Sequence, residues 1–260
     1  MISEAIKATI RQKLQEIERQ ENVCIFYACE SGSRAWGFPS ADSDYDVRFI
    51  YIHPRDWYLS IEDRRDVIER PLVENIDLSG WEIRKALRLF RKSNPPLLEW
   101  LRSPIIYQQK FSVADQFKSF TPHFYSPANC FNHYLHMGWG IFRENLTGET
   151  VKSKRYFYVL RPLLACRWIQ QGLGPVPMEF EILVNKLISS ESLKKEISRL
   201  VERKREGQEM DAEKKIPIIS DFIESEFADL KQQTELPLSS SNESEQLNEL
   251  FRAALIEVWK

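Results

Sequence analysis

Gly32-Ser33 and Asp44-Tyr45-Asp46 stand between two apolar runs, and their types and spacing suit phosphate chemistry. Backbone N–H groups beside a glycine can reach a phosphate without obstruction from a Cβ atom, and the start of a helix adds partial positive charge. Asp44 and Asp46 are two residues apart, so on a strand their side chains point to the same side and can share one or two divalent cations. Each signal alone also fits an ordinary turn, because Gly, Ser and Asp are common turn residues.

A third acidic residue, Asp77, ends an apolar segment just before a helical pattern. If this segment pairs with the strand that begins at Asp46, Asp77 projects toward the same place, whereas Glu74 should face the other way. Asn75 shares the side of Asp77 but carries no charge. Three carboxylates at one place repel one another unless a cation lies between them, and Mg²⁺ prefers such hard oxygen ligands. The trio therefore indicates metal-bound triphosphate chemistry.

The elements that must position these residues follow from hydrophobic periodicity. Apolar residues recur every three or four positions over residues 2–20, which predicts an amphipathic helix. Strands are expected at 22–30 and 45–52, with two brief strand segments in 67–78 interrupted by Pro71. Ser79 and Glu82 have the spacing of a capping box, which predicts that a helix begins there. A short helix and a strand are expected in 96–107, and a helical piece at 111–120.

The texture changes at about residue 122, because every later segment has a helical pattern and strand signals disappear. Loops rich in Gly, Pro or Ser are expected at 172–177 and 235–246. We therefore predict an α+β protein in which residues 1–121 form an α/β domain with a small mixed sheet. Residues 122–260 should form an all-helical domain.

Composition limits the partners. The chain has 260 residues and a net charge of −2, so it offers no global basic field and must hold any nucleic acid locally. Its four cysteines show no C-x-x-C spacing, which argues against a zinc site or a disulfide framework. The amino terminus lacks the apolar core of a signal peptide, and no stretch approaches membrane-spanning length. A cytoplasmic protein without a membrane partner is the expectation.

The Gly-Ser pair, Asp44-Tyr45-Asp46 and Asp77 together resemble the signature of the DNA polymerase beta nucleotidyltransferase superfamily. The wording of residues 30–51, 77–107 and 154–169 is similar to a bacterial and phage group of polymerase-beta-like proteins of RNA repair pathways. The likeness covers most of residues 23–170. It implies a small mixed sheet flanked by helices.

The resemblance also implies an activity and its ligands. Two Mg²⁺ ions, for which Mn²⁺ can substitute, would be held by Asp44, Asp46 and Asp77. A nucleoside monophosphate would pass from ATP or another NTP to an acceptor hydroxyl, with release of pyrophosphate. Gly32 and Ser33 would contact the triphosphate. The acceptor is open among an RNA end, a protein and a small molecule.

Further residues are candidates for the nucleotide. Arg34 could bind the β or γ phosphate, or be a surface arginine. Lys154, Tyr158 and Arg161 fall at i, i+4 and i+7 of one predicted helix and could form a lid over the triphosphate. A solvated basic face is the alternative for this trio. His133 is three residues before another histidine, but aromatic packing explains this pair better than zinc binding does.

Two alternatives to a transferase stay open. A non-catalytic nucleotide-binding or antitoxin-type module would keep the Gly-Ser pair and lose a carboxylate, but all three carboxylates are present. A metal-dependent phosphoesterase would usually also use histidine ligands. His53 is the histidine closest in sequence to the aspartates, and it should lie at the far end of the strand that Asp46 begins.

Overall fold

The computed structural model describes residues 2–208, 213–232 and 244–260. Contacts divide the chain into two compact units. The first contains residues 1–35, 44–125 and 240–260, and the second contains 36–43 and 126–239. The expected domain boundary after residue 121 stays a prediction. Residues 235–243 of the expected loop lie outside the described residues.

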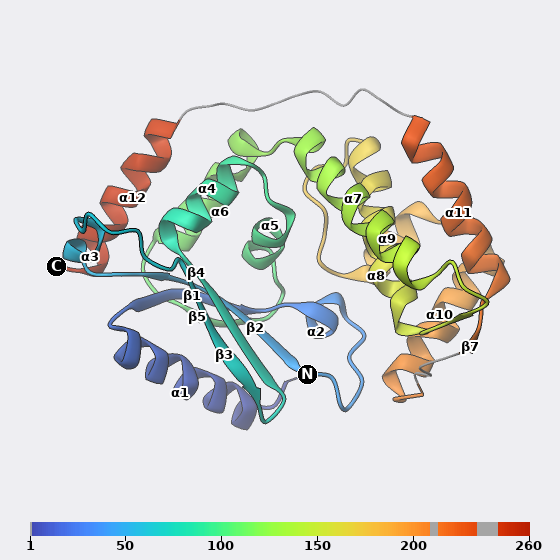
Figure 1. Cartoon of the computed structure of the whole chain (residues 1–260), viewed down its shortest axis with the longest axis horizontal. Helices are drawn as coiled ribbons and strands as arrows, with labels where there is room; N and C mark the ends of the chain where they lie inside the picture. The colour runs from blue at the N-terminus through green and yellow to red at the C-terminus, as the bar shows by residue number, and fades with distance from the viewer. Residues whose placement is uncertain (1, 209–212, 233–243) are drawn as a thin grey trace. The chain divides into compact units, whose positions relative to one another are not determined.

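The first unit is built on a five-stranded mixed sheet with the strand order β3-β4-β2-β1-β5 (Figure 1). Its strands are β1 (Cys24–Glu30), β2 (Tyr45–Ile52), β3 (Val67–Val73), β4 (Ile76–Glu82) and β5 (Ile106–Gln109). Its helices are α1 (Glu4–Glu21), α2 (Gly32–Trp36), α3 (Arg55–Tyr58), α4 (Ile83–Arg91), α5 (Pro95–Leu101), α6 (Val113–Phe124) and α12 (Ser244–Val258). The β2–β4 pair is parallel and the other neighbouring pairs of this sheet are antiparallel. A small mixed sheet flanked by helices is therefore confirmed.

Helices cover both faces of this sheet: α1 lies on one face, and α4, α5 and α6 lie on the other (Figure 1). The predicted amphipathic helix is α1, whose N-cap Ser3 accepts a hydrogen bond from the backbone N–H of Ile6. Its apolar stripe is buried with residues from β1 and β2 in one hydrophobic core. This packing holds β1 and β2, which border the Gly-Ser segment and the aspartates.

The β3–β4 hairpin differs from the expectation in two ways. Pro71 does not interrupt the strand, because β3 is an edge strand where the missing N–H of proline is tolerated. The chain reverses instead at Glu74 and Asn75, both with positive φ, as a two-residue hairpin turn requires. The predicted capping box is also wrong, since Ser79 lies inside β4. Glu82 caps α4 by accepting hydrogen bonds from the N–H groups of Arg84 and Lys85.

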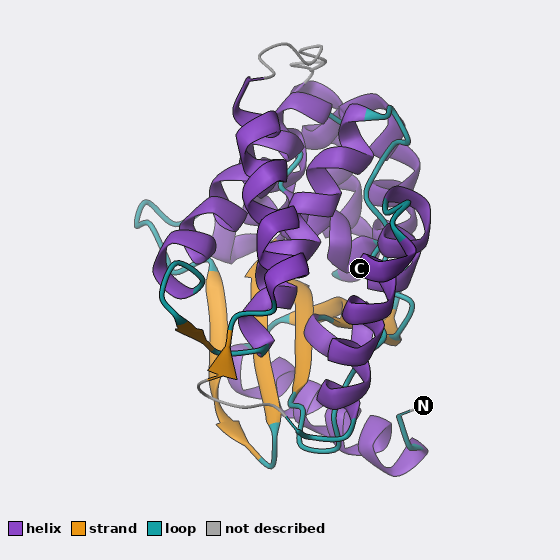
Figure 2. Cartoon of the chain, turned by 90° about the vertical axis from the view of Figure 1, so that its right-hand side faces the viewer, coloured by secondary structure: helices purple, strands orange, loops and turns teal. Residues whose placement is uncertain are grey.

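The second unit is mainly helical (Figure 2). Its helices are α7 (Pro127–Asn145), α8 (Lys154–Gln170), α9 (Phe180–Leu187), α10 (Glu191–Arg205) and α11 (Pro217–Gln232). The mostly buried α8 packs against α7, α9 and α11. Sequence patterns did not predict the short antiparallel pair β6 (Thr150–Val151) and β7 (Glu213–Lys214). None of the described helices combines the length and the apolar character that crossing a membrane requires.

Candidate nucleotide and metal site

Strands β2 and β4 bring two of the three predicted aspartates to the same place. The strands are parallel, and Asp46 is the register partner of Asp77. Neighbouring strands lie about 4.8 Å apart, so side chains that leave one face at one register position are adjacent. Asp44 lies just before β2 and is exposed, and its charge acts on the carboxyl of Asp46. The strand pairing that the sequence required for a shared site is confirmed.

Arg48 lies between the carboxylates of Asp46 and Asp77. Its Nη2 atom is 3.0 Å from Oδ1 of Asp46 and 2.7 Å from Oδ2 of Asp77. Its Nη1 atom also donates to the backbone oxygen of Asp77, at 3.3 Å. Because strand side chains alternate, Arg48 leaves β2 on the same face as Asp46. The positively charged Arg48 guanidinium therefore bridges the carboxylates of Asp46 and Asp77.

Gly32 approaches the carboxylate of Asp46 so closely that no side chain fits at this position. A Cβ atom at Gly32 would lie 2.0 Å from Oδ2 of Asp46, and the residue has φ of +60°. A backbone hydrogen bond also joins the two segments, because the N–H of Ser31 donates to the carbonyl oxygen of Asp46 at 2.8 Å. The Gly-Ser segment and the aspartate strand are therefore adjacent, as phosphate binding beside a metal site requires.

Ser33 and Arg34 follow Gly32 in α2, which has five residues. So short a helix contributes little dipole, and any phosphate contact here must come from individual N–H groups. Arg34 donates from Nε to the backbone oxygen of Asp44 at 3.1 Å, and its guanidinium lies 3.9 Å from the ring centroid of Tyr45. The structure therefore places Arg34 at the start of β2, beside Asp44.

A buried carboxyl supports Asp46 from behind. Glu30, at the end of β1, accepts a hydrogen bond from the backbone N–H of Asp46 at 2.8 Å and another from the hydroxyl of Tyr107. Its side chain is fully buried. Burial raises the pKa of Glu30 to about 7, against the opposing effect of these hydrogen bonds. Glu30 therefore holds the backbone of β2 in place at Asp46.

The electrostatics of Asp46 favour a cation. Burial raises the pKa of its carboxyl, and the negative charges of Asp77 and Asp44 raise it further, while Arg48 lowers it. The Asp46 carboxyl therefore ionises more readily when a further positive charge lies beside it. Carboxylate oxygens are hard ligands, so the donor set fits Mg²⁺ or Mn²⁺.

The arrangement of the aspartates is not a preformed metal cage. Among residues 2–208, 213–232 and 244–260, no three His, Cys, Asp or Glu side chains converge closely enough to hold an ion. Asp46 and Asp77 are instead paired with Arg48. Metal binding by these two residues would require the Arg48 guanidinium to move aside.

The predicted lid residues lie on α8 of the second unit, and they differ in exposure. Lys154 and Tyr158 are exposed, whereas Arg161 is only 2% exposed. Its Nη2 atom lies 3.4 Å and 3.5 Å from the carbonyl oxygens of Pro177 and Met178. The role of all three residues toward a nucleotide stays a prediction, and Lys154 and Tyr158 have the exposure that it needs.

His53 lies at the other end of β2 from Asp46, as the sequence indicated. Seven residues of extended chain separate them, which corresponds to about 23 Å. The ring of His53 stacks on that of Trp57, with centroids 4.0 Å apart, and burial lowers the pKa of the imidazole to about 4. His53 is thus a packed residue, which leaves the phosphoesterase reading without its nearest candidate histidine ligand.

Sequence reasoning did not identify three residues of this site: Arg48, Glu30 and Tyr107. A signal for Arg48 was present, because strand alternation puts it on the same face as Asp46. For Glu30 the signal was an acidic residue directly after a run of six strand residues. Tyr107 offered none, since its contact with Glu30 depends on β5 pairing with β1.

Comparisons with known proteins give a matching family and similar chains. A family model described as RlaP, RNA repair pathway DNA polymerase beta family, matches residues 6–253. The chain is 48% identical over 256 residues to the uncharacterized protein YcgL of Bacillus subtilis (strain 168). The aligned residues cover 98% of each of the two chains. A nucleotidyltransferase-like protein from Exiguobacterium sibiricum 255-15 aligns over 96% of this chain and 89% of its own, with 12% identity and a TM-score of 0.33.

Proposed function

The chain belongs to the RNA repair pathway DNA polymerase beta family, and on that premise we propose that it transfers a nucleoside monophosphate from an NTP to an acceptor hydroxyl. The observation that carries the proposal is the pairing of Asp46 with Asp77 on adjacent parallel strands. Beside them lies Gly32, a position where no side chain fits. This geometry puts two carboxylates next to the Gly-Ser segment, and this arrangement supports binding of a metal-bound triphosphate.

Asp44, Asp46 and Asp77 would hold two Mg²⁺ ions, or Mn²⁺ in their place. When bound, such ions stabilise the negative charge that develops on the entering and departing oxygens at the α phosphorus. Asp44 and Asp46 come from the same end of β2, so both would be ligands of the ions. Asp77 comes from the neighbouring strand and suits the position beside the attacking hydroxyl.

The residues of the chain supply the remaining steps. The acceptor O–H bond breaks as its oxygen bonds to the α phosphorus, and the bond from that phosphorus to pyrophosphate breaks. Asp77 would take the acceptor proton. The N–H groups at Gly32 and Ser33 would bind the triphosphate, with Arg34 on its β or γ phosphate. Lys154 and Tyr158 would neutralise and cover the triphosphate as a lid, and Arg161 would support the helix that carries them.

Before substrate binds, Arg48 would keep the two carboxylates converged in place of the ions. Its guanidinium neutralises charge that would otherwise push Asp46 and Asp77 apart. The family description favours an RNA end as acceptor. ATP is the NTP we propose first.

The test is a label-transfer assay with the whole chain. Each α-labelled NTP is incubated with RNAs that carry different 3′ ends, with proteins and with aminoglycosides, in Mg²⁺, in Mn²⁺ and in EDTA. Metal-dependent transfer to one acceptor class, with pyrophosphate released in equal amount, would support the proposal and identify the acceptor. No transfer across the panel, together with measurable NTP binding, would instead support a nucleotide-binding module without transfer. The ion pairs of Arg48 with both carboxylates are the observation that favours that second candidate.

A further inference from the structure

Helix α4 carries an unusual concentration of positive charge. Its nine residues and the following Lys92 contain Arg84, Lys85, Arg88 and Arg91 and no acidic residue. The whole chain has a net charge of −2, so this helix is a local exception. The apolar side of α4 is buried, which leaves the basic side chains to its remaining surface.

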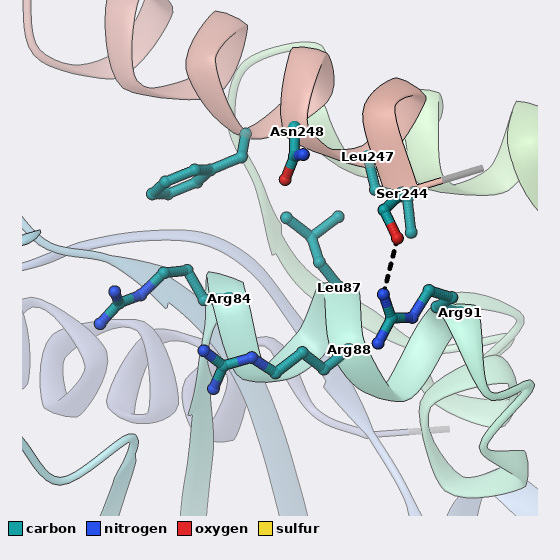
Figure 3. Close-up of a pocket in the computed structure, with 8 residues that line it drawn as sticks. Arg84, Leu87, Arg88, Arg91, Ser244, Leu247 and Asn248 are labelled. Carbon is teal, nitrogen blue, oxygen red and sulfur yellow. Dashed lines mark hydrogen bonds between the residues drawn. The ribbon is translucent and has the colours of Figure 1, made fainter. Parts of the chain in front are cut away.

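Three of these arginines line a pocket between α4 and α12 (Figure 3). We define the arginine groove as this pocket, with a volume of about 210 Å³ and a lining of Arg84, Leu87, Arg88, Arg91, Ser244, Leu247, Asn248 and Phe251. None of these eight lining residues, all from the described part of the chain, carries a carboxylate. Figure 3 shows Leu87 directed toward α12, between the helices, and the Arg91 side chain turned to Ser244. The Arg91 Nη1 atom donates to Oγ of Ser244 at 2.7 Å.

The charge of the groove is only partly neutralised. Arg84 lies 3.8 Å from Glu82 and contacts the rings of Trp57 and Tyr58. Arg88 is exposed, and neither it nor Arg91 forms an ion pair with a residue that the structure describes. Two guanidinium groups therefore remain available to an anion, and no described residue that lines the groove offers a competing carboxylate.

The size and spacing of the groove point to the phosphates of a strand. Small-molecule sites commonly have about 300–1,000 Å³, so this pocket is small for a whole nucleotide. Arg84, Arg88 and Arg91 are repeated along one face of α4, and seven residues of helix span about 10 Å. Charges spread over this length suit successive phosphates of a chain better than one phosphate ion. Guanidinium groups also match phosphate oxygens by two-point hydrogen bonding.

The arginine groove lies away from the aspartates. Asp77 is near the beginning of β4, and α4 begins directly after the end of that strand. The five-residue step from Asp77 to Glu82 corresponds to about 17 Å of strand. A strand whose end reacts beside Asp77 would have its upstream phosphates at such a distance.

We propose that the arginine groove binds backbone phosphates of a single-stranded RNA acceptor, upstream of the end that reacts. This inference rests on the proposed function for the identity of the acceptor, but its binding site is separate. Contacts to phosphates carry no sequence information, so the groove contributes affinity and register, and the RNA sequence matters little to it.

Fluorescence anisotropy with a labelled single-stranded RNA tests the inference, with the whole chain in EDTA and without NTP. Arg88→Ala and Arg91→Ala should each weaken binding about tenfold, the effect of losing one charge-assisted hydrogen bond. Each change should also reduce the slope of log affinity against log salt by about 0.7. Arg91→Lys keeps the charge and should bind more tightly than Arg91→Ala.

Arg19→Ala is the matched control, because Arg19 is an exposed arginine of α1, on the opposite face of the sheet. It should bind RNA like the wild type. The inference is overturned if the wild type does not bind the RNA, if the groove variants bind as well as Arg19→Ala, or if tripolyphosphate binds the groove and RNA does not displace it. RNA binding that needs the arginines, without label transfer to any acceptor, would defeat the proposed function alone. Label transfer with unchanged RNA binding in the variants would defeat the groove alone.

Discussion

Asp46 and Asp77 are register partners on parallel strands, and one guanidinium nitrogen contacts both of their carboxylates. The relationship depends on a long connection, because the chain must pass through β3 and a tight hairpin before β4 returns beside β2. The single positive charge of Arg48 offsets only part of the negative charge of the aspartates, so the site still favours a further cation. A cation that binds Asp46 and Asp77 must therefore also displace the Arg48 guanidinium.

Replacing Arg48 should separate its effect on stability from its competition with a metal ion. Arg48→Gln removes the cation between two carboxylates that are 30% and 38% exposed, so in EDTA it should lower the free energy of unfolding by about 1–2 kcal/mol. Mn²⁺ should then raise the melting temperature of the variant more than that of the wild type, because the ion no longer competes with a guanidinium. Arg70→Gln, which removes a surface ion pair with Glu21, is the control and should show no added response to Mn²⁺. Equal Mn²⁺ responses in Arg48→Gln and wild type would contradict the competition.

Gly32→Ala should damage the site through two separable effects. A left-handed φ costs about 1–2 kcal/mol for a residue with a Cβ atom, and here that atom also overlaps the carboxylate of Asp46. Displacement of the carboxylate should reduce nucleotide transfer about 100-fold. Gly37→Ala is the control for a side chain at positive φ without a clash, since Gly37 has φ of +96° with nothing within 4 Å of the added atom. That variant should lose stability but keep its transfer rate in the label-transfer assay. Equal rates for both variants would show that the close approach to Asp46 has no catalytic importance.

The buried Glu30 should make stability depend on pH. Its pKa is raised to about 7, so between pH 4.5 and 7 the folded chain binds more protons than the unfolded chain. The stability that the protonated carboxyl contributes is therefore fully present below about pH 4.5 and is lost as pH rises through 7. Relative to Glu30→Gln, the wild type should lose up to about 3 kcal/mol by pH 8. Urea unfolding of both proteins in EDTA at pH 5 and pH 8 measures this difference. A constant difference between the two proteins would mean that Glu30 titrates normally.

The presence of Asp46 and Asp77 on strands was predictable from local patterns, whereas their adjacency depends on the non-local pairing of β2 with β4. Alternation fixed the face of Asp46, but Asp77, which was expected at the end of a strand, is the second residue of β4. The start of α4 was not predictable from the Ser79 and Glu82 spacing, since β4 lies between β2 and β3 and its ladder continues to Glu82. Gly80 belongs to that strand for a tertiary reason: a Cβ atom there would lie 2.1 Å from the ring of Phe49.

The contacts that organise the site from behind were harder to predict. Glu30 meets Tyr107 only through the pairing of β1 with β5, and 77 residues separate the two along the chain. The helix face expected from Lys154, Tyr158 and Arg161 is regular in spacing, yet packing against Pro177 and Met178 buries its last member. Spacing indicates which residues share a face, and only packing decides which of them reach solvent.

The most direct test is the rate of Mg²⁺-dependent pyrophosphate release and label transfer by Asp77→Asn and Asp46→Asn, compared with Asp42→Asn. Asp42 is an exposed aspartate close in sequence to Asp44, so its variant controls for the loss of one negative charge. We predict that Asp77→Asn and Asp46→Asn each lose at least about 100-fold in rate, as removal of a positioned catalytic group does, while Asp42→Asn stays near the wild type. Near-normal turnover by Asp77→Asn, in a folded variant, would contradict the account.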